Sequence, residues 1–290
     1  MKHSLLLALS TGMLLVPTVS ALEAWAPGIY KQGDEYVGWY DYHKSGSNDG
    51  VMADTAMCWA ASASNVISWW QNLNISSTTS SVPQNEEIFD TFRAIYTNGG
   101  GKAYYAYEWW VNGNWSVPTG SGWAGIDKGM PTEYTAYANG GFLSEVYDTS
   151  LYPITIATSS NNPYSYSKAV VNALSNGYAL TLSVENSGVA HAYTLWGAEY
   201  DITSNGYELT AVWLTNSDDI NNEPEMFRKD VICSYSEKNG GTGSVAFDEN
   251  MGATFAQVSG LRSAPRSVPE PASAALSLLA LAGLACRRRR

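Results

Sequence analysis

The sequence is poor in charge, in cysteine and in histidine. Charged residues make up 15% of the 290 residues, and the 16 basic ones are outnumbered by 27 acidic ones. The resulting net charge of −11 argues against nucleic acid as a partner, because binding to phosphates needs a positive surface. The three histidines and three cysteines limit the choice of reactive groups. We expect no cofactor and no metal.

Long apolar runs are also missing, and the two short ones lie at the ends of the chain. Residues 1–21 hold Lys2, an apolar run from Leu5 to Val16, and the small residues Val19-Ser20-Ala21. This order is typical of a signal peptide that is cleaved after Ala21. The apolar run is too short to span a bilayer as an ordinary helix.

The other end has a Pro-Glu-Pro motif at 269–271, an apolar stretch over 274–285 and four arginines at 287–290. Taken alone, these features also fit a short membrane anchor with its positive residues inside. Their order resembles the PEP-CTERM sorting signal, which implies an exported protein of a Gram-negative envelope, at the cell surface or secreted, with an exosortase as partner.

We therefore divide the chain into a signal peptide over 1–21, a main domain over 22–262, and a linker with sorting tail over 263–290. Removal of residues 1–21 and 268–290 takes away five basic residues and one acidic residue, which leaves a net charge of −15.

The few cysteines leave little room for disulfides. Cys286 lies in the tail, so only Cys58 and Cys233 remain. An exported protein can pair them. A single bridge would nevertheless be an unusual framework for a domain of this size, and Cys233 follows the apolar, strand-like pair Val231-Ile232. We favour two unpaired thiols.

The stretch Asp54–Trp70 predicts a helix with Cys58 in its first turn. Asp54 or Thr55 is expected to act as N-cap, and Val66, Ile67 and Trp70 fall on one apolar face. The helix dipole and the unpaired N–H groups of a first turn stabilise a thiolate there. The same groups can receive an oxyanion. A small buried thiol is the alternative for Cys58.

The rest of the chain predicts helices first and an antiparallel meander second, which is an α+β layout. Two further helices are expected over Glu86–Tyr96 and Ser165–Ser175. Residues 22–53 read as extended and turn-rich. The alternating runs predict strands over Tyr178–Val184, Val189–Asp201 and Tyr207–Thr215, with a hairpin turn at Ser204-Asn205-Gly206. Two more strands are expected near Lys229–Tyr235 and Gly243–Phe247, and Ala253–Leu261 leads out of the domain.

Residues 103–123 are dense in aromatic side chains, with interleaved glycine, asparagine and serine that make a simple core helix doubtful. One interpretation is an aromatic groove for peptide or sugar. The other is an insertion that packs on the core. The indoles of this segment also allow a second function, a surface-attached module that binds glycans or protein on an inactive fold, and they are Trp109, Trp110, Trp115 and Trp123.

The spacing of three residues predicts thiol chemistry. A thiol protease needs a thiolate, an imidazole that shares and returns the proton, and a polar group that orients the imidazole. Cys58 is followed after 133 residues by His191 and after 25 more by Asn216, an order also found in papain-like enzymes. Antiparallel pairing brings the start of the His191 strand close to the end of the next strand, where Asn216 lies. His43 competes as a base, but little else supports it.

Several motifs resemble the IdeS/Mac family of immunoglobulin G-degrading cysteine endopeptidases. The resemblance spans roughly residues 36–262 and is weak over 76–165. The motifs are Gly38-Trp39-Tyr40-Asp41 with Lys44, Cys58-Trp59-Ala60-Ala61 before Trp69-Trp70, His191 through Leu195-Trp196-Gly197-Ala198, Thr215-Asn216-Ser217-Asp218, and Gly252-Ala253 with Gln257-Val258-Ser259-Gly260-Leu261.

This resemblance implies a papain-like fold, a protein substrate and roles for five residues. Cys58 would be the nucleophile and His191 the general base and acid, and Lys44 would complete the oxyanion hole with the Cys58 backbone N–H. Asn216 stands where the family has an aspartate that orients the histidine, and Asp218 matches a second acidic residue. An amide still accepts a hydrogen bond from imidazole but supplies no countercharge, so Asp218 would matter more here. Immunoglobulin as substrate is less secure than proteolysis.

Overall fold

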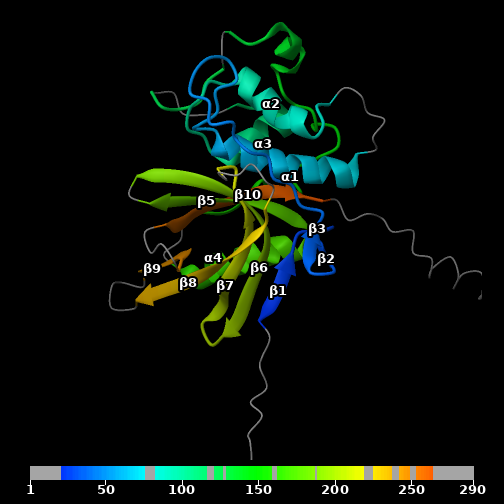
Figure 1. Cartoon of the computed structure of the whole chain (residues 1–290). Coiled ribbons are helices and arrows are strands. Elements are labelled where there is room, and N and C mark those ends of the chain that lie inside the picture. Colours follow the sequence, from blue (N-terminus) through cyan, green and yellow to red (C-terminus); the bar gives the residue numbers. More distant parts are fainter. Residues whose placement is uncertain are drawn as a thin grey trace, which may run out of the picture.

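The architecture is that of a computed structural model, which describes residues 21–75, 82–115, 121–126, 129–158, 162–186, 188–218, 225–236, 242–248 and 253–263. Within these residues the protein has a helical side and a sheet side, with the first three helices on one side of the sheet (Figure 1). The α+β class predicted from the sequence is confirmed. The predicted signal peptide (except Ala21) and the sorting tail (except Ser263) lie outside the described residues.

One antiparallel sheet of eight strands forms the larger part of the fold. The predicted meander β5-β6-β7-β8-β9 is present and continues into β10, which also pairs with β5, so that the strands close into a ring. The strands are β1 (Leu22–Trp25), β4 (Thr155–Thr158), β5 (Tyr178–Asn186), β6 (Val189–Thr203), β7 (Gly206–Thr215), β8 (Phe227–Ser236), β9 (Thr242–Phe247) and β10 (Thr254–Arg262).

The N-terminal segment contributes more regular structure than its turn-rich sequence indicates. Strand β5 pairs with the first part of β6, up to Leu195. Strand β1 pairs with the same edge of β6 farther along, from Gly197 to Tyr200. A small separate hairpin follows, formed by β2 (Tyr30–Gln32) and β3 (Glu35–Val37). These strands are short, so the sequence gives only a few residues of alternation from which to predict them.

Helix α1 (Cys58–Asn74) contacts β5, β6 and β10 of the sheet on one side and the next two helices of the chain on the other. Val66, Ile67 and Trp70 of the predicted apolar face are buried, and the burial extends to all of residues 59–71, so the helix has no solvent face beyond its last turn. Polar side chains on α1 are satisfied inside the protein. Ser62 donates to the carbonyl oxygen of Ala192 at 2.9 Å, and Asn65 donates to Thr194 Oγ1 at 2.8 Å. These bonds fix α1 against β6.

The predicted N-cap of α1, in contrast, is wrong. The capping position is Met57, and no side chain caps the helix. Asp54 is fully buried and is used elsewhere, because its carboxylate accepts the N–H of Ser45 at 2.7 Å and lies 3.3 Å from Arg93 Nε. The side chain therefore ties two loops together, and the first-turn N–H groups of α1 have no side-chain acceptor.

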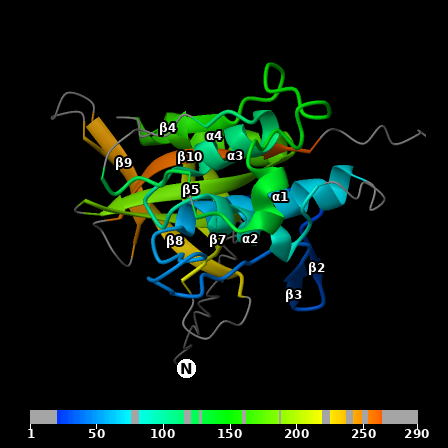
Figure 2. The ribbon, with the colours of Figure 1, turned by 90° about the horizontal axis from the view of Figure 1, so that it is seen from above.

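Two further helices complete the helical side, α2 (Glu86–Ile95) and α3 (Ala103–Asn112). Seen from above, α3 lies with α1 beside β5 and β10 (Figure 2), and α2 packs against α1. The helix α2 was predicted within one residue, whereas α3 contradicts the expectation that no simple core helix occurs in 103–123. Its indoles are core residues, with Trp109 1% and Trp110 0% exposed, and Trp110 donates to the buried Gln71 at 3.1 Å.

Helix α4 (Pro163–Ser175) begins with Asn162 as its N-cap and contacts seven of the strands, from β1 to β9. It fills the side of the ring away from α1 and seals the core there (Figure 1). A short 3-10 helix, η1 (Thr132–Tyr137), lies beside α2. None of the described helices is both long and apolar enough to cross a membrane.

Candidate functional site

A cleft of about 1010 Å³ opens between the two sides of the fold. Its floor is the start of α1, where Cys58 is the first helical residue. One wall is the sheet, from β4 to β6, and the other is formed by residues 100–102 and 122–123. Gly101 lets that wall come close to the floor, because a Cβ there would lie 2.5 Å from the ring of Trp59.

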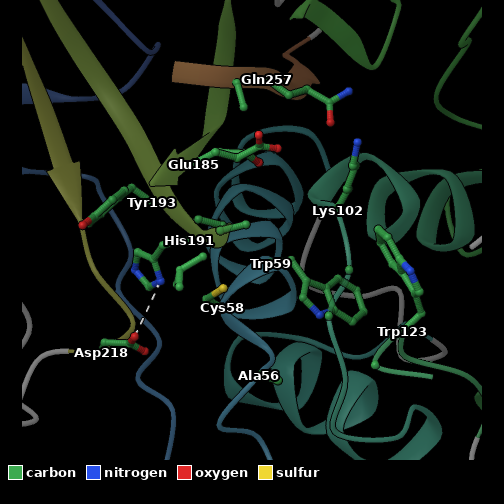
Figure 3. Close-up of a pocket in the computed structure, with 18 of the residues that line it drawn as sticks. Ala56, Cys58, Trp59, Lys102, Trp123, Glu185, His191, Tyr193, Asp218 and Gln257 are labelled. Carbon is green, nitrogen blue, oxygen red and sulfur yellow. Dashed lines mark ion pairs between the residues drawn. The ribbon is translucent and has the colours of Figure 1, made fainter. Parts of the chain in front are cut away.

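Cys58 and His191 point toward one another in this cleft (Figure 3). Interaction with the His191 side chain and with the backbone of Ala192 favours the thiolate form of Cys58. The position of His191 follows from the sheet register, because Thr194 of β6 pairs with Thr215 of β7 and so places the end of β7 beside the start of β6. The predicted proximity of the two strand ends is confirmed. Cys58 and Cys233 are both free thiols, as expected.

The side chain of Asn216 lies within hydrogen-bond distance of the imidazole of His191. Its Oδ1 lies 2.8 Å from His191 Nε2 and also accepts the backbone N–H of Asp218 at 3.2 Å. A backbone N–H can only donate, so this atom is the amide oxygen rather than the amide nitrogen. His191 Nε2 must therefore carry a proton, which leaves Nδ1 to face the thiol.

Asp218 links the histidine to Lys44. One carboxylate oxygen lies 2.5 Å from Lys44 Nζ and the other 3.6 Å from His191 Nδ1. Lys44 Nζ also donates to the carbonyl oxygen of Thr55 at 2.7 Å. The backbone N–H of Lys44 donates to the carbonyl oxygen of Ser217 at 2.9 Å. An ammonium group has three donors, so one remains for a group in the cleft. The carboxylate supplies the countercharge that the Asn216 amide lacks.

The two reactive groups shift each other's pKa in opposite directions. Burial raises the pKa of the Cys58 thiol, but the hydrogen bond and charge of His191, together with the charge of Lys44, outweigh it, so the net pKa is lowered. Burial lowers the pKa of His191, and the hydrogen bonds to Cys58 and Asn216 together with the charge of Asp218 raise it overall. Both shifts favour a thiolate beside an imidazolium.

The structure thus brings together all five predicted site residues, from α1, β6, the turn after β7 and the loop before α1. The competing base His43 lies elsewhere, 3.7 Å from the buried Asp41, and does not line the cleft. Sequence reasoning missed Tyr193, whose ring meets that of His191 edge-on with centroids 4.6 Å apart. The strand predicted over Val189–Asp201 could have indicated this contact, because residues two apart on a strand share a face.

The predicted aromatic surface is largely absent. Trp109 and Trp110 are buried, and Trp115 stacks on Tyr96 with ring centroids 3.8 Å apart. Of these four indoles, Trp123 alone lines the cleft, and it is 37% exposed. The prediction that this segment packs on the core is therefore confirmed for most of its indoles.

The fold and the site together define an α+β domain that presents a Cys–His pair at a helix N-terminus in an open cleft. The sequence profile of the Mac-1 family (Mac 1) matches residues 28–95 and 78–258. The chain therefore belongs to the Mac-1 family.

A protein of known activity is distantly similar. The IgM protease of Streptococcus suis (strain P1/7) is 28% identical over 212 residues, which cover 63% of this chain and 18% of that protein. The chain thus spans less than a fifth of the length of this relative.

The end of the chain matches a sorting motif. Residues 267–290 match the PEP-CTERM protein-sorting motif, as the sequence predicted. This motif indicates an exported protein of a Gram-negative cell envelope that an exosortase processes.

Proposed function

We propose that this chain is an exported cysteine endopeptidase, with a papain-like peptidase domain over residues 22–262. The observation that carries the proposal is the line of contacts from Cys58 through His191 to Asn216 at the start of α1. A thiol, a base and a polar group that orients the base are the parts that nucleophilic acyl transfer needs. Membership of the Mac-1 family and similarity to an IgM protease agree with it.

In the first half of the reaction, the Cys58 thiolate attacks the carbonyl carbon of a peptide bond. The negative charge that develops on the carbonyl oxygen is stabilised by the backbone N–H of Cys58 and by the free donor of Lys44. His191 then gives its Nδ1 proton to the leaving nitrogen, the C–N bond breaks, and a thioester remains on Cys58.

In the second half, water attacks the thioester. His191 accepts a proton from the water at Nδ1, the carbon–sulfur bond breaks, and the acid product leaves. Asn216 holds the imidazole ring throughout, and Asp218 balances the charge of the imidazolium and of Lys44. Lys44, Asn216 and Asp218 therefore act by position and charge, whereas Cys58 and His191 make and break bonds.

The decisive test uses a thiol-reactive, peptide-like probe. We expect it to label Cys58, and we expect the His191→Ala variant to lose this labelling, because the thiolate is stabilised by His191. Cys233 is the matched control, since burial raises the pKa of its thiol, and Cys233→Ala should label normally. Absent labelling of Cys58, or labelling unaffected by His191→Ala, would refute the proposal.

The substrate class is proposed to be protein, and immunoglobulin is the first substrate to test because of the relative's name. The purified protein would be incubated with IgM and IgG, with Cys58→Ala as the control. Because the match covers 18% of that relative, cleavage profiling on a mixed proteome should accompany the test.

A further inference from the structure

The sheet wall of the cleft carries a row of polar side chains that the proposed reaction does not use. Gln257 of β10 pairs with Thr158 of β4 on one side and with Ser183 of β5 on the other. Ser183 in turn pairs with Ala192, the neighbour of His191. All four residues line the cleft, so the row runs across the sheet toward the reactive pair.

Glu185 adds a negative charge to this row. Successive side chains on a strand alternate, so Glu185 shares the face of Ser183 and of Thr181, whose hydroxyl contacts Tyr107 of α3 at 2.6 Å. This face is therefore the one turned to the helices. At Glu185 the helices no longer cover it, and the side chain is exposed in the cleft.

The charged and amide groups here lack partners in the protein. Among the described residues, neither the Glu185 carboxylate nor the Gln257 amide forms a hydrogen bond or ion pair, and the Lys102 ammonium across the cleft has none either. The side chains of Glu185 and Gln257 come from the sheet side of the cleft, and that of Lys102 comes from the helical side (Figure 3). Small residues leave room between them, because Gly100, Gly101 and Ala190 also line the cleft.

We propose that Glu185 and Gln257 form a subsite for a basic side chain of the substrate, arginine above all. A guanidinium group has five donors in a planar fork that matches a carboxylate, and the nearby amide and hydroxyl oxygens offer further acceptors. Lys102 repels a second positive charge on the helical side and so directs the basic side chain to the sheet. This inference deepens the proposed peptidase function and rests on it.

The register also places this subsite along the substrate. Glu185 pairs with Ala190, the residue before His191, and paired Cα atoms in an antiparallel sheet lie about 5 Å apart. Side chains alternate along a strand, so Glu185 and His191 leave the sheet on opposite faces, but both lie near the ends of β5 and β6 and both line the cleft. An extended peptide advances about 3.3 Å per residue. The basic side chain is therefore expected within two residues of the bond that is cleaved.

Cleavage profiling on a proteome-derived peptide mixture tests this, with the wild type, Glu185→Gln, Glu185→Lys and Glu145→Gln compared. Glu145 is an exposed acid outside the cleft lining, so Glu145→Gln makes the same charge change elsewhere. For the best peptide, replacing its arginine by glutamine should lower kcat/KM by roughly tenfold to a hundredfold in the wild type and in Glu145→Gln. The loss should shrink to about threefold or less in Glu185→Gln, and Glu185→Lys should disfavour basic residues.

The outcomes separate this inference from the function it rests on. Wild-type cleavage with no enrichment of arginine or lysine near the cut, or enrichment that persists in Glu185→Lys, overturns the subsite and leaves the peptidase intact. Absent cleavage together with absent probe labelling of Cys58 overturns both. Lys102→Gln should retain the preference for basic residues, and its loss in that variant would also contradict the assignment.

Discussion

Asn216 offers the sharpest test of how the site works, because one atom holds the imidazole. Its Oδ1 accepts from His191 Nε2 at 2.8 Å and from the N–H of Asp218 at 3.2 Å. In Asn216→Ala the imidazole loses the bond that fixes its ring, and the Asp218 turn loses one of its supports. Both groups that orient or balance His191 are therefore affected by one change.

The magnitude follows from the kind of bond. A hydrogen bond to a charged group contributes about 1.5–3 kcal/mol, which corresponds to roughly tenfold to a hundredfold in rate. We expect Asn216→Ala to lower kcat/KM for a fluorogenic peptide by this factor. In Asn216→Asp, a carboxylate facing Nε2 raises the pKa of His191 further, so the alkaline limb of the pH–rate profile should move to higher pH.

The assay compares pH–rate profiles of the wild type and both variants. Asn72→Ala is the matched control, because Asn72 is exposed in the last turn of α1. Its amide donates only to the carbonyl oxygen of Ser68 and to the side chain of Asn85. A value of kcat/KM for Asn216→Ala within about twofold of the wild type would refute the role given to this bond. An unmoved alkaline limb in Asn216→Asp would refute the electrostatic part.

Three other predictions follow from the site and the core. The rate of Cys58 alkylation by iodoacetamide should rise with pH at a midpoint below the ordinary thiol value of 9.0, and His191→Ala should move this midpoint upward; equal midpoints would contradict the pairing. Lys44→Met should lower kcat roughly a hundredfold with a smaller change in KM, because an oxyanion donor acts in the transition state; a change confined to KM in peptide kinetics would argue against that role. Trp110→Ala should lower the free energy of unfolding by about 3–5 kcal/mol in urea titrations, whereas Trp123→Ala, at an exposed site, should cost less than about 1 kcal/mol; similar costs would contradict the burial described.

Much of the fold was predictable because its signals are local. Alternation over β5, β6 and β7 predicted three long strands, and the Asn205-Gly206 turn fixed the register between β6 and β7. That register alone placed Asn216 beside the start of the His191 strand. The short strands β1–β4 were missed, because three or four residues carry too little periodicity.

Other errors arose where packing overrides local preference. Asp54 is a good N-cap by type, yet its carboxylate is taken by Ser45 and Arg93, which come from other segments. The run over 103–112 consists largely of aromatic residues and contains few strong helix formers. The burial of Trp109 and Trp110 nevertheless makes it a core helix. Helix propensity is a weak prior against such burial.

The sequence by itself determined the Mac-1 family, the α+β class and the set of five candidate site residues, because motifs, strand alternation and turn residues are carried by neighbours in the chain. Only the tertiary structure decided which group holds which. It showed that His191 Nε2 forms a hydrogen bond with Asn216 and that Asp218 lies between His191 and Lys44. It also brought Glu185 and Gln257 from separate strands to one wall of the cleft. Hydrogen bonds and charges depend on distances of a few ångströms between segments that are far apart in the chain, and those distances are set by the packing of the helices on the sheet.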